Sequence, residues 1–260
     1  MASDPHTPAN LRRIAQRLLP LIDLTSLNDS DDAAVIERLC ARARTPAGNV
    51  AAVCIHGPHI PVAKRALAGS GVPIATVTNF PAGSADVVAT AKETAAAVAL
   101  GADEVDVVFP YGALIVGHAS AGLDLVKAAK AACGSKALLK VILETGQLKT
   151  PQLIRTASEI AIAGGADFIK TSTGKTQPGA TLEAAQVMLE AIAAARAERR
   201  WVGFKASGGV RTVSEAQAYL ALADKILGEG FASAATFRVG ASALLDDVML
   251  CLGLGSEGAR

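Results

Sequence analysis

The sequence alternates eight times between a short run rich in β-branched residues and a longer, Ala-rich segment with helical spacing. Strands that alternate with helices of this length indicate βαβ units, in which consecutive strands lie parallel. The alternation continues along the chain without a break in composition, so we predict one domain over residues 1–260. The predicted strands are residues 21–25, 50–55, 74–79, 104–109, 138–144, 168–172, 202–207 and 237–241.

The segments between these strands predict eight helices. Eight βα units in 260 residues, close to the ~250 residues typical of this fold, predict a single (β/α)8 TIM barrel of parallel strands with an N-terminal extension. An open doubly wound sheet is the alternative, but no G-x-G-x-x-G motif follows the first strand. The predicted helices are residues 31–44, 60–68, 85–100, 121–132, 151–163, 182–197, 213–227 and 242–252. The expected N-caps are Asp31, Ser84, Thr150 and Thr212, and the expected helix ends are Gly101, Gly134 and Gly164.

Composition and charge argue against several classes of function. The net charge is +1 and no Lys/Arg cluster is interleaved with aromatic residues, so we expect no nucleic-acid partner. The first ten residues lack an apolar segment of the signal-peptide type, and no uncharged apolar run reaches ~18 residues, so we expect a cytoplasmic protein without a membrane partner. Cys54 lies near His56 and His59, but we interpret these as a buried thiol and two loop histidines, and we predict neither a metal nor a cofactor.

Charged residues alternate with apolar ones in several of the predicted strands. Because successive side chains of a strand point to opposite faces, Lys140, Lys170 and Lys205 each lie opposite apolar neighbours, as do Glu104 and Asp106. Helices cover the outer face of barrel strands, so we predict that these charged side chains point into the barrel. Interior salt bridges that only fill the barrel are the structural alternative, but buried ion pairs often stabilise less than apolar packing, which favours a chemical role.

Two lysines on neighbouring strands indicate amine chemistry. Burial and a nearby cation both lower the pKa of a lysine. At a pKa near 7 about half of such amines are neutral at pH 7, compared with about one in ~2,500 at the ordinary value near 10.4. A neutral amine beside a second ammonium can add to a carbonyl group and form an imine. Lys170 and Lys205 form such a pair, either of them being a candidate nucleophile, and Asp106 can move the protons.

Glycines follow the last three predicted strands, at the end where barrels commonly bind phosphate. Glycine allows backbone N–H groups to approach an anion closely. Each of these turns alone is typical of an ordinary loop or helix cap, but together they predict a phosphate pocket. The residues are Gly174 and Lys175 after the sixth strand, Gly208 and Gly209 after the seventh, and Gly240 and Ser242 at the eighth.

Six segments, spread in order over most of the chain, contain the three lysines, Glu104, Asp106 and most of the glycines of the predicted phosphate pocket. They are 24–28 (LTSLN), 76–81 (TVTNFP), 104–110 (EVDVVFP), 139–146 (LKVILETG), 168–175 (FIKTSTGK) and 203–212 (GFKASGGVRT). Their sequences and spacing resemble the family of deoxyribose-phosphate aldolases. The resemblance implies a class I aldolase without metal, which reversibly cleaves 2-deoxy-D-ribose 5-phosphate into D-glyceraldehyde 3-phosphate and acetaldehyde. Its partners would be small phosphorylated sugars and aldehydes.

The resemblance also implies a role for each site residue. Lys170 would form the imine, Lys205 would lower the pKa of Lys170, and Asp106 would relay protons. Other implied contacts are to the substrate hydroxyls by Asp23 and Thr173, to Asp106 by Lys140, and to the phosphate by Gly174, Lys175, Gly208, Gly209, Gly240 and Ser242.

The sequence departs from a well-known branch of this family at three places. Ala243 follows Ser242 where that branch has a second serine, so one phosphate contact is expected to be absent. Residues 54–58 (CIHGP) differ from the Cys-Ile-Tyr-Pro of that branch, at the expected rim of the pocket. Residues 256–260 lack the terminal tyrosine that assists proton transfer in that branch, which predicts a slower proton-exchange step.

Two other functions fit parts of the pattern. A transaldolase or another imine-forming barrel would use the same chemistry on a different sugar phosphate. A barrel that only binds a phosphorylated metabolite is the non-enzymatic alternative, but a pure binding site has no need for a lysine of lowered pKa. Outward helix faces, such as that of residues 121–132, are Ala-rich and suit packing within one chain or between two. The sequence is therefore compatible with a monomer or a homo-oligomer.

Overall fold

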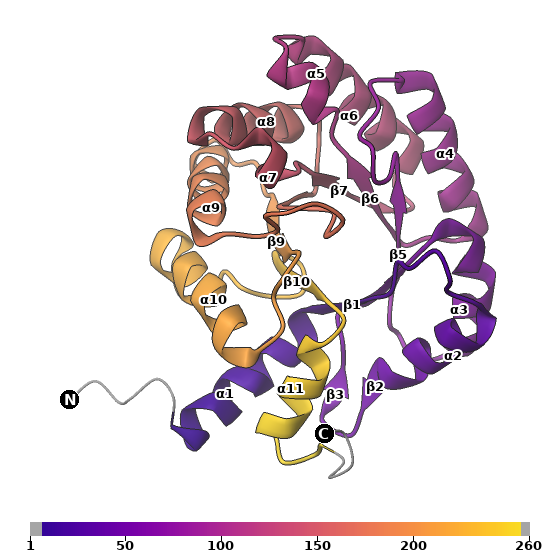
Figure 1. The fold of residues 1–260 in the computed structure, drawn as a ribbon, viewed down its shortest axis with the longest axis vertical. Coiled ribbons are helices and arrows are strands. Elements are labelled where there is room, and N and C mark those ends of the chain that lie inside the picture. Colours follow the sequence, from indigo (N-terminus) through magenta and orange to yellow (C-terminus); the bar gives the residue numbers. More distant parts are fainter. Residues whose placement is uncertain (1–6, 256–260) are drawn as a thin grey trace.

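Eight parallel strands form a closed barrel in the computed structural model, which describes residues 7–255 (Figure 1). The strands pair in chain order around the ring, and the ring closes between the first and the last strand, where Ile22 is in register with Val239. All eight predicted strands are present with bounds within two residues of the prediction, which confirms the (β/α)8 barrel. The strands are β1 (Ile22–Thr25), β4 (Ala52–Ile55), β5 (Ile74–Thr78), β6 (Glu104–Val108), β7 (Leu138–Ile142), β8 (Phe168–Lys170), β9 (Gly203–Ser207) and β10 (Phe237–Ala241).

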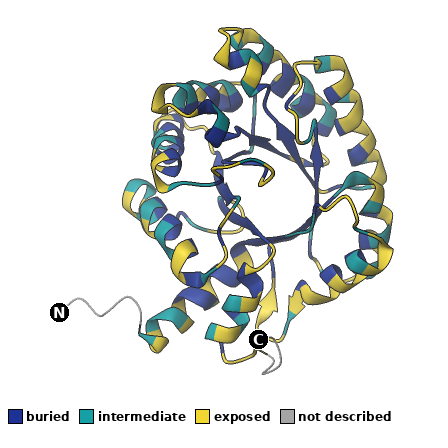
Figure 2. Ribbon diagram, viewed as in Figure 1, coloured by how far each residue is buried: buried dark blue, intermediate teal, exposed yellow. Residues whose placement is uncertain are grey.

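Helices surround the ring, with their buried faces toward the strands and their exposed faces outward (Figure 2). The apolar strand face meets these helices, and Leu139, Ile169 and Phe204 are fully buried there. No helix within residues 7–255 is long and apolar enough to cross a membrane. The eight predicted helices are present as α2 (Ala33–Arg42), α3 (Ile60–Ala66), α4 (Val87–Leu100), α6 (Ala119–Cys133), α8 (Pro151–Ala163), α9 (Leu182–Ala197), α10 (Val213–Leu227) and α11 (Leu244–Cys251).

Most of the predicted cap residues lie at helix ends. The hydroxyls of Thr150 and Thr212 each accept a hydrogen bond from the backbone N–H three residues further on, and so cap α8 and α10. The glycines at positions 101, 134 and 164 end α4, α6 and α8, as predicted.

Two of the predicted N-caps were wrong. The N-cap of α2 is Asp32 rather than Asp31, because the Asp31 carboxylate accepts hydrogen bonds from the loop before the helix, including one from the Asn28 side chain. The N-cap of α4 is Asp86 rather than Ser84, because the Ser84 hydroxyl accepts a hydrogen bond from the Asp86 N–H in the preceding turn. Both helices therefore begin two residues later than predicted.

The N-terminal extension contains a helix that we did not predict. This helix, α1 (Pro8–Leu18), is capped by the hydroxyl of Thr7 and has proline at its first position. It packs beside α10 and α11 (Figure 1), and Arg17 forms an ion pair with Asp224 of α10 at 2.6 Å. The other unpredicted elements are η1 (Leu19–Leu21), β2 (Arg44–Thr45), β3 (Gly48–Asn49), η2 (Gly57–His59), α5 (Tyr111–Ile115) and α7 (Thr145–Leu148).

The interior of the barrel has an apolar side and a charged side. Small side chains of β4 and β5, together with Leu27, form an apolar cluster separate from the main core. The other six strands supply buried charged side chains instead. The apolar cluster consists of Leu27, Ala52, Cys54, Ala75 and Val77.

Candidate active site

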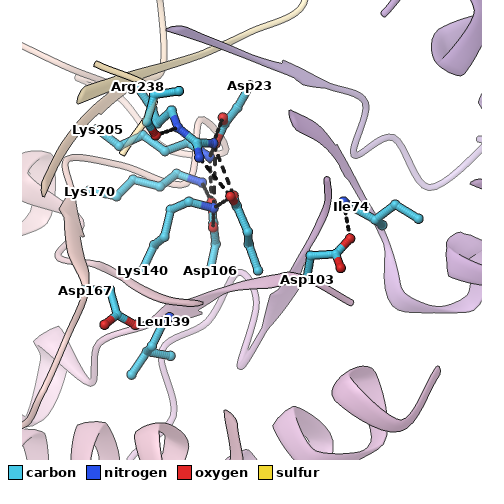
Figure 3. Close-up of polar contacts among 12 residues, drawn as sticks. Asp23, Ile74, Asp103, Asp106, Leu139, Lys140, Asp167, Lys170, Lys205 and Arg238 are labelled. Carbon is cyan, nitrogen blue, oxygen red and sulfur yellow. Dashed lines mark hydrogen bonds and ion pairs between the residues drawn. The ribbon is translucent and has the colours of Figure 1, made fainter. Parts of the chain in front are cut away.

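Seven charged side chains meet inside the barrel, and Figure 3 shows the cations converging on Asp23 and Asp106. Each of the seven is at most 4% exposed. The charged strand face therefore points into the barrel, as the alternation predicts. These residues, called the interior charge cluster below, are Asp23 of β1, Glu104 and Asp106 of β6, Lys140 of β7, Lys170 of β8, Lys205 of β9 and Arg238 of β10.

Asp106 lies at the centre of the interior charge cluster. Its Oδ2 accepts hydrogen bonds from Lys170 Nζ at 2.9 Å and from Lys205 Nζ at 2.7 Å. Its Oδ1 accepts a third hydrogen bond, from Lys140 Nζ at 2.8 Å. Lys170 and Lys205 are also Cα partners in the paired strands β8 and β9. The two candidate nucleophiles therefore face each other across a single carboxylate oxygen.

The three lysines do not share the carboxylates equally. Lys140 Nζ lies within 3.7 Å of three carboxylates and Lys205 Nζ within 2.7 Å of two. Within the described residues, Lys170 pairs with Asp106 alone. Lys170 is therefore the ammonium whose charge is least compensated. The contacts other than those to Asp106 are Lys140–Glu104 at 2.5 Å, Lys140–Asp23 at 3.7 Å and Lys205–Asp23 at 2.5 Å.

This unequal sharing separates the pKa values of the three amines. Burial lowers the pKa of Lys170 below the ordinary value of 10.5, and the neighbouring Lys205 lowers it further against the opposing attraction of Asp106. Burial also acts on Lys140 and Lys205, but their carboxylate partners outweigh it and raise both pKa values. Lys170 is therefore the amine that loses its proton most readily, a ranking that the pattern of residues left open and that only the family resemblance implied.

The carboxylates of the cluster are held in their ionised form. Burial alone would raise the pKa of Asp106, but the three lysines outweigh burial and hold this pKa well below 3.8. The pKa of Asp23 is lowered in the same way by Lys205 and Arg238. Asp23 Oδ2 accepts from Lys205 and Oδ1 from Arg238, so both oxygens are occupied in this fully buried residue.

Arg238 is the member of the cluster that we did not predict. It lies in β10 between Phe237 and Val239, so the same alternation that identified the lysines also marks this arginine. Its guanidinium donates hydrogen bonds to Asp23 Oδ1 at 2.6 Å and to Glu104 Oε1 at 2.8 Å. Arg238 therefore joins two carboxylates that have no contact with Lys170.

A pocket of about 280 Å³ opens beside the cluster at the carboxyl ends of the strands. The segments that follow β1, β8, β9 and β10 line it. A Cβ added to Gly240, which lines the pocket, would lie 2.9 Å from Lys205 Cε, so the pocket borders the interior charge cluster. All six predicted phosphate-binding residues and Thr173 line it, whereas Asp23 does not. These residues are Thr173, Gly174, Lys175, Gly208, Gly209, Gly240 and Ser242.

The pocket contains groups that suit an anion. Gly208 and Gly209 adopt φ values of +93° and +97°, a conformation that favours glycine. Lys175 spans the mouth of the pocket, because its Nζ donates a hydrogen bond to the carbonyl of Leu27 at 2.6 Å. Arg211, which we did not single out from the sequence, is a second cation in the lining.

The segment that holds Lys175 is fixed by Thr173. The Thr173 hydroxyl donates a hydrogen bond to Glu144 Oε2 at 2.5 Å and accepts one from the backbone N–H of Lys175 at 3.0 Å. Glu144 follows β7 on the same strand face as Lys140 and is fully buried. Thr173 therefore connects the pocket lining to the neighbouring strand.

Two of the three departures from the family pattern lie in described residues. Ala243 lines the pocket beside Ser242. His56 packs edge-on against Phe80 at 5.9 Å between ring centroids. Residues 256–260 lie outside the described part of the chain. Within residues 7–255, no group of three or more His, Cys, Asp or Glu side chains is arranged to hold a metal ion.

The fold and this site define a class of protein. Barrel enzymes have their active sites at the carboxyl ends of the strands. Here the buried interior charge cluster borders a pocket at that end, and the pocket is suited to an anion. The chain belongs to the DeoC/LacD family of aldolases, whose family model matches residues 17–247. Aldolases are lyases that form and cleave carbon–carbon bonds.

Solved structures agree with this family. A candidate deoxyribose-phosphate aldolase of Toxoplasma gondii ME49 is 23% identical, with a TM-score of 0.86 over 96% of this chain and 98% of that one. A candidate deoxyribose-phosphate aldolase of Coccidioides immitis is 29% identical, with a TM-score of 0.76 over 90% of this chain and 85% of that one. The tetrameric deoxyribose phosphate aldolase of Aeropyrum pernix is 23% identical, with a TM-score of 0.70 over 94% and 92% of the two chains. The first and third likenesses show a common fold.

Proposed function

We propose that this protein is a class I deoxyribose-phosphate aldolase. It reversibly cleaves 2-deoxy-D-ribose 5-phosphate into D-glyceraldehyde 3-phosphate and acetaldehyde through an imine on Lys170. The observation that carries the proposal is the position of Lys170, a buried amine with one carboxylate partner and a lowered pKa, below a pocket suited to phosphate. Membership of the aldolase family and the names of the similar structures support the reaction and the substrate.

Imine formation uses the neutral form of Lys170. The amine adds to carbon 1 of the open-chain sugar, and the carbonyl oxygen leaves as water after it has been protonated. Asp106, with one oxygen 2.9 Å from Lys170 Nζ, accepts and returns the protons of these steps, directly or through a water. Lys205 remains protonated beside them, because its raised pKa keeps the charge that lowers the pKa of Lys170.

Cleavage follows from the positive charge on the protonated imine. A base removes the proton of the hydroxyl on carbon 3, the bond between carbons 2 and 3 breaks, and its electron pair moves toward the imine nitrogen. Carbon 3 becomes the aldehyde of D-glyceraldehyde 3-phosphate, and carbon 2 becomes part of an enamine. Protonation of carbon 2 and hydrolysis of the resulting imine release acetaldehyde and regenerate the amine.

The remaining residues bind the substrate or hold the catalytic groups. Thr173 contacts a substrate hydroxyl from the pocket lining, and Lys140 keeps Asp106 ionised and oriented. Asp23 holds Lys205 in its charged form. We also propose that Asp23 lies near the substrate hydroxyls. The proposed phosphate contacts are Gly174, Lys175, Gly208, Gly209, Gly240 and Ser242.

Reduction of the imine by borohydride tests the proposal. The protein is incubated separately with acetaldehyde, with 2-deoxyribose 5-phosphate and with a ketose phosphate, treated with borohydride, digested and mapped by mass spectrometry. We expect an increase equal to one ethyl group on the peptide that contains Lys170. An adduct of a three-carbon ketose, formed only with ketose phosphates, would instead indicate a transaldolase. Absence of any adduct on Lys170 with every one of these compounds would reject an imine mechanism.

A further inference from the structure

The interior charge cluster contains more cations than carboxylates. Four cationic side chains face three carboxylates, and all seven are buried. The surplus cannot be screened by solvent, because each of these residues is at most 4% exposed. One of the four cations is an arginine, which stays protonated at every pH that a protein tolerates. Only the three lysines can remove the surplus, and they do so when one of them loses a proton.

Arg238 binds carboxylate oxygens that could otherwise accept hydrogen bonds from the lysines. Its Nη1 donates to Asp23 Oδ1 at 2.6 Å and lies 3.2 Å from Glu104 Oε2, and its Nη2 donates to Glu104 Oε1 at 2.8 Å. Its Nε donates to the carbonyl of Ala234 at 2.5 Å, and its guanidinium carbon lies 5.5 Å from the centre of the Phe168 ring. These four partners hold the guanidinium in place.

Because Arg238 binds Asp23 and Glu104, Lys170 is left with one carboxylate partner. Asp106 is the only carboxylate of the cluster that Arg238 does not contact, and it is already shared by all three lysines. Lys140 and Lys205 each have a second carboxylate, whereas Lys170 has none. Arg238 does not line the pocket at the carboxyl ends of the strands, so it does not contact the phosphate end of a substrate bound there.

We infer that Arg238 is a positioning residue for the proposed imine chemistry: its fixed charge, bound between Asp23 and Glu104, makes Lys170 the amine that is left neutral. The inference rests on the proposed function for its catalytic meaning, but the charge relationship can be measured without catalysis. Loss of the arginine charge frees oxygens on two carboxylates of the cluster. The more negative surroundings then hold a proton on Lys170 more tightly.

Several charged or titratable groups face Lys170 or one of its partners, and Glu144, which is buried after β7, binds Thr173 instead. Asp106 faces Lys170 from β6, Lys205 from β9 and Lys140 from β7, and the Cys54 thiol faces it from β4. Burial raises the pKa of Cys54, so the thiol stays neutral at ordinary pH. The remaining members are Asp23 on β1, Glu104 on β6 and Arg238 on β10. The inward residues of β5, Ala75 and Val77, do not titrate.

Labelling with formaldehyde measures the charge state of Lys170 without any substrate. Formaldehyde and a mild borohydride methylate any accessible neutral amine, and peptide mapping gives the rate at Lys170 as a function of pH. The proteins compared are the wild type, Arg238→Met, Arg238→Lys, Glu104→Gln and Phe237→Leu. Phe237 points outward beside Arg238 and packs against Phe204 at 5.7 Å between ring centroids, so Phe237→Leu controls for loss of packing without loss of charge.

The charge relationship predicts a sign for each variant. In Arg238→Met the pH midpoint of labelling moves upward by about one unit, so that roughly tenfold less neutral amine is present at a fixed pH below the midpoint. Arg238→Lys keeps the charge and restores the midpoint toward that of the wild type. Glu104→Gln removes a carboxylate, increases the surplus and moves the midpoint downward. Phe237→Leu leaves it in place.

The outcomes separate this inference from the proposed function. An unchanged midpoint in both Arg238→Met and Glu104→Gln overturns the inference, as does a shift in Phe237→Leu as large as that in Arg238→Met. If Arg238→Met does not fold, the other two variants test the inference. It then requires a downward shift of the midpoint in Glu104→Gln and a midpoint close to that of the wild type in Arg238→Lys. A wild-type midpoint below that of ordinary lysines, together with no adduct from acetaldehyde or 2-deoxyribose 5-phosphate, would reject the proposed function and leave the charge relationship standing.

Discussion

Lys170 and Lys205 donate hydrogen bonds to the same oxygen of Asp106, at 2.9 and 2.7 Å. Two ammonium groups this close repel each other, and Asp106 compensates both only in part because it also binds Lys140. Lys205 has a second carboxylate and keeps its proton, so the repulsion is relieved by loss of the proton from Lys170. The distribution of the carboxylates therefore makes Lys170 the amine that loses its proton most readily, as the proposed imine chemistry requires.

Replacement of Lys205 tests this relationship. Lys205→Met removes the neighbouring cation and raises the pKa of Lys170, so at neutral pH the rate of acetaldehyde trapping on Lys170 should fall by roughly tenfold or more. The rate should recover as the pH is raised, because the amine itself is intact. Lys127→Met, at an exposed position of α6, is the control and should keep the wild-type profile. A rate that stays low at every pH would assign Lys205 a direct role instead.

The pH dependence of cleavage follows from the direction of the Lys170 shift. The reactive form is the neutral amine, and the pKa of Lys170 is below 10.5. Activity should therefore rise with pH through this lowered pKa and be lost as the pH falls through it. This rise is measured as the initial rate of 2-deoxyribose 5-phosphate cleavage, with substrate in excess. The rate is recorded across the pH range in which the protein stays folded. A rate that rises only near the pKa of an ordinary lysine would contradict the assignment.

The barrel and the direction of its charged face could be predicted from sequence because both are local signals. A strand with alternating polarity places Lys140, Lys170 and Lys205 on one face whatever the rest of the chain does. The same signal marks Arg238, which we overlooked because it stands alone in its strand. The ranking of Lys170 above Lys205 was not accessible in this way, since it depends on carboxylates contributed by distant strands.

The errors in secondary structure have physical causes of the same kind. Asp31 and Asp32 are both good N-cap residues, and the contact between Asn28 and Asp31 decides between them. The helix α1 has only two buried aliphatic positions, Ile14 and Leu18, beside Ala15, and it is stabilised by packing on helices from the other end of the chain. Contacts of this range leave little trace in the local sequence.

Asp106 should be essential for stability as well as for chemistry. Asp106→Asn removes the shared carboxylate from three buried lysines, and the loss of one partner from a buried ion pair costs about 3–5 kcal/mol. The midpoint of urea unfolding at neutral pH should fall accordingly. The folded-state pKa values of Asp106 and Asp23 lie below 3.8, so their contribution is present above that pH and is lost as the pH falls below it.

The wild type should therefore unfold in acid, at a pH below about 4, with a transition that involves more than one proton. In Asp106→Asn this acid transition should become shallower, since one of the depressed carboxyl groups is gone. Circular dichroism at a series of pH values measures both curves. Equal steepness in the two proteins would show that Asp106 is not a main source of the acid sensitivity.

Gly240 is a position where a single methyl group should disturb the site. A Cβ at Gly240 would lie 2.9 Å from both Lys205 Cε and Ser207 Oγ. In Gly240→Ala one of these side chains must move, so kcat/KM for 2-deoxyribose 5-phosphate should fall by about tenfold or more, with a loss of stability of about 1–3 kcal/mol. Gly112→Ala in α5 is the matched control, because a Cβ there meets nothing within 4 Å. Similar activities of the two variants would exclude a tight contact at Gly240.

Ala243 is a position where a hydroxyl should improve the site. It lines the pocket at the carboxyl ends of the strands beside Ser242, and a hydrogen bond to a charged group contributes about 1.5–3 kcal/mol. Because the added side chain is exposed, a smaller gain is expected in Ala243→Ser, with KM for 2-deoxyribose 5-phosphate falling by about threefold to tenfold. Cleavage of unphosphorylated 2-deoxyribose provides the control, since it has no phosphate to bind and its kcat/KM should not change. An equal improvement for both sugars would place the effect of the hydroxyl elsewhere than at the phosphate.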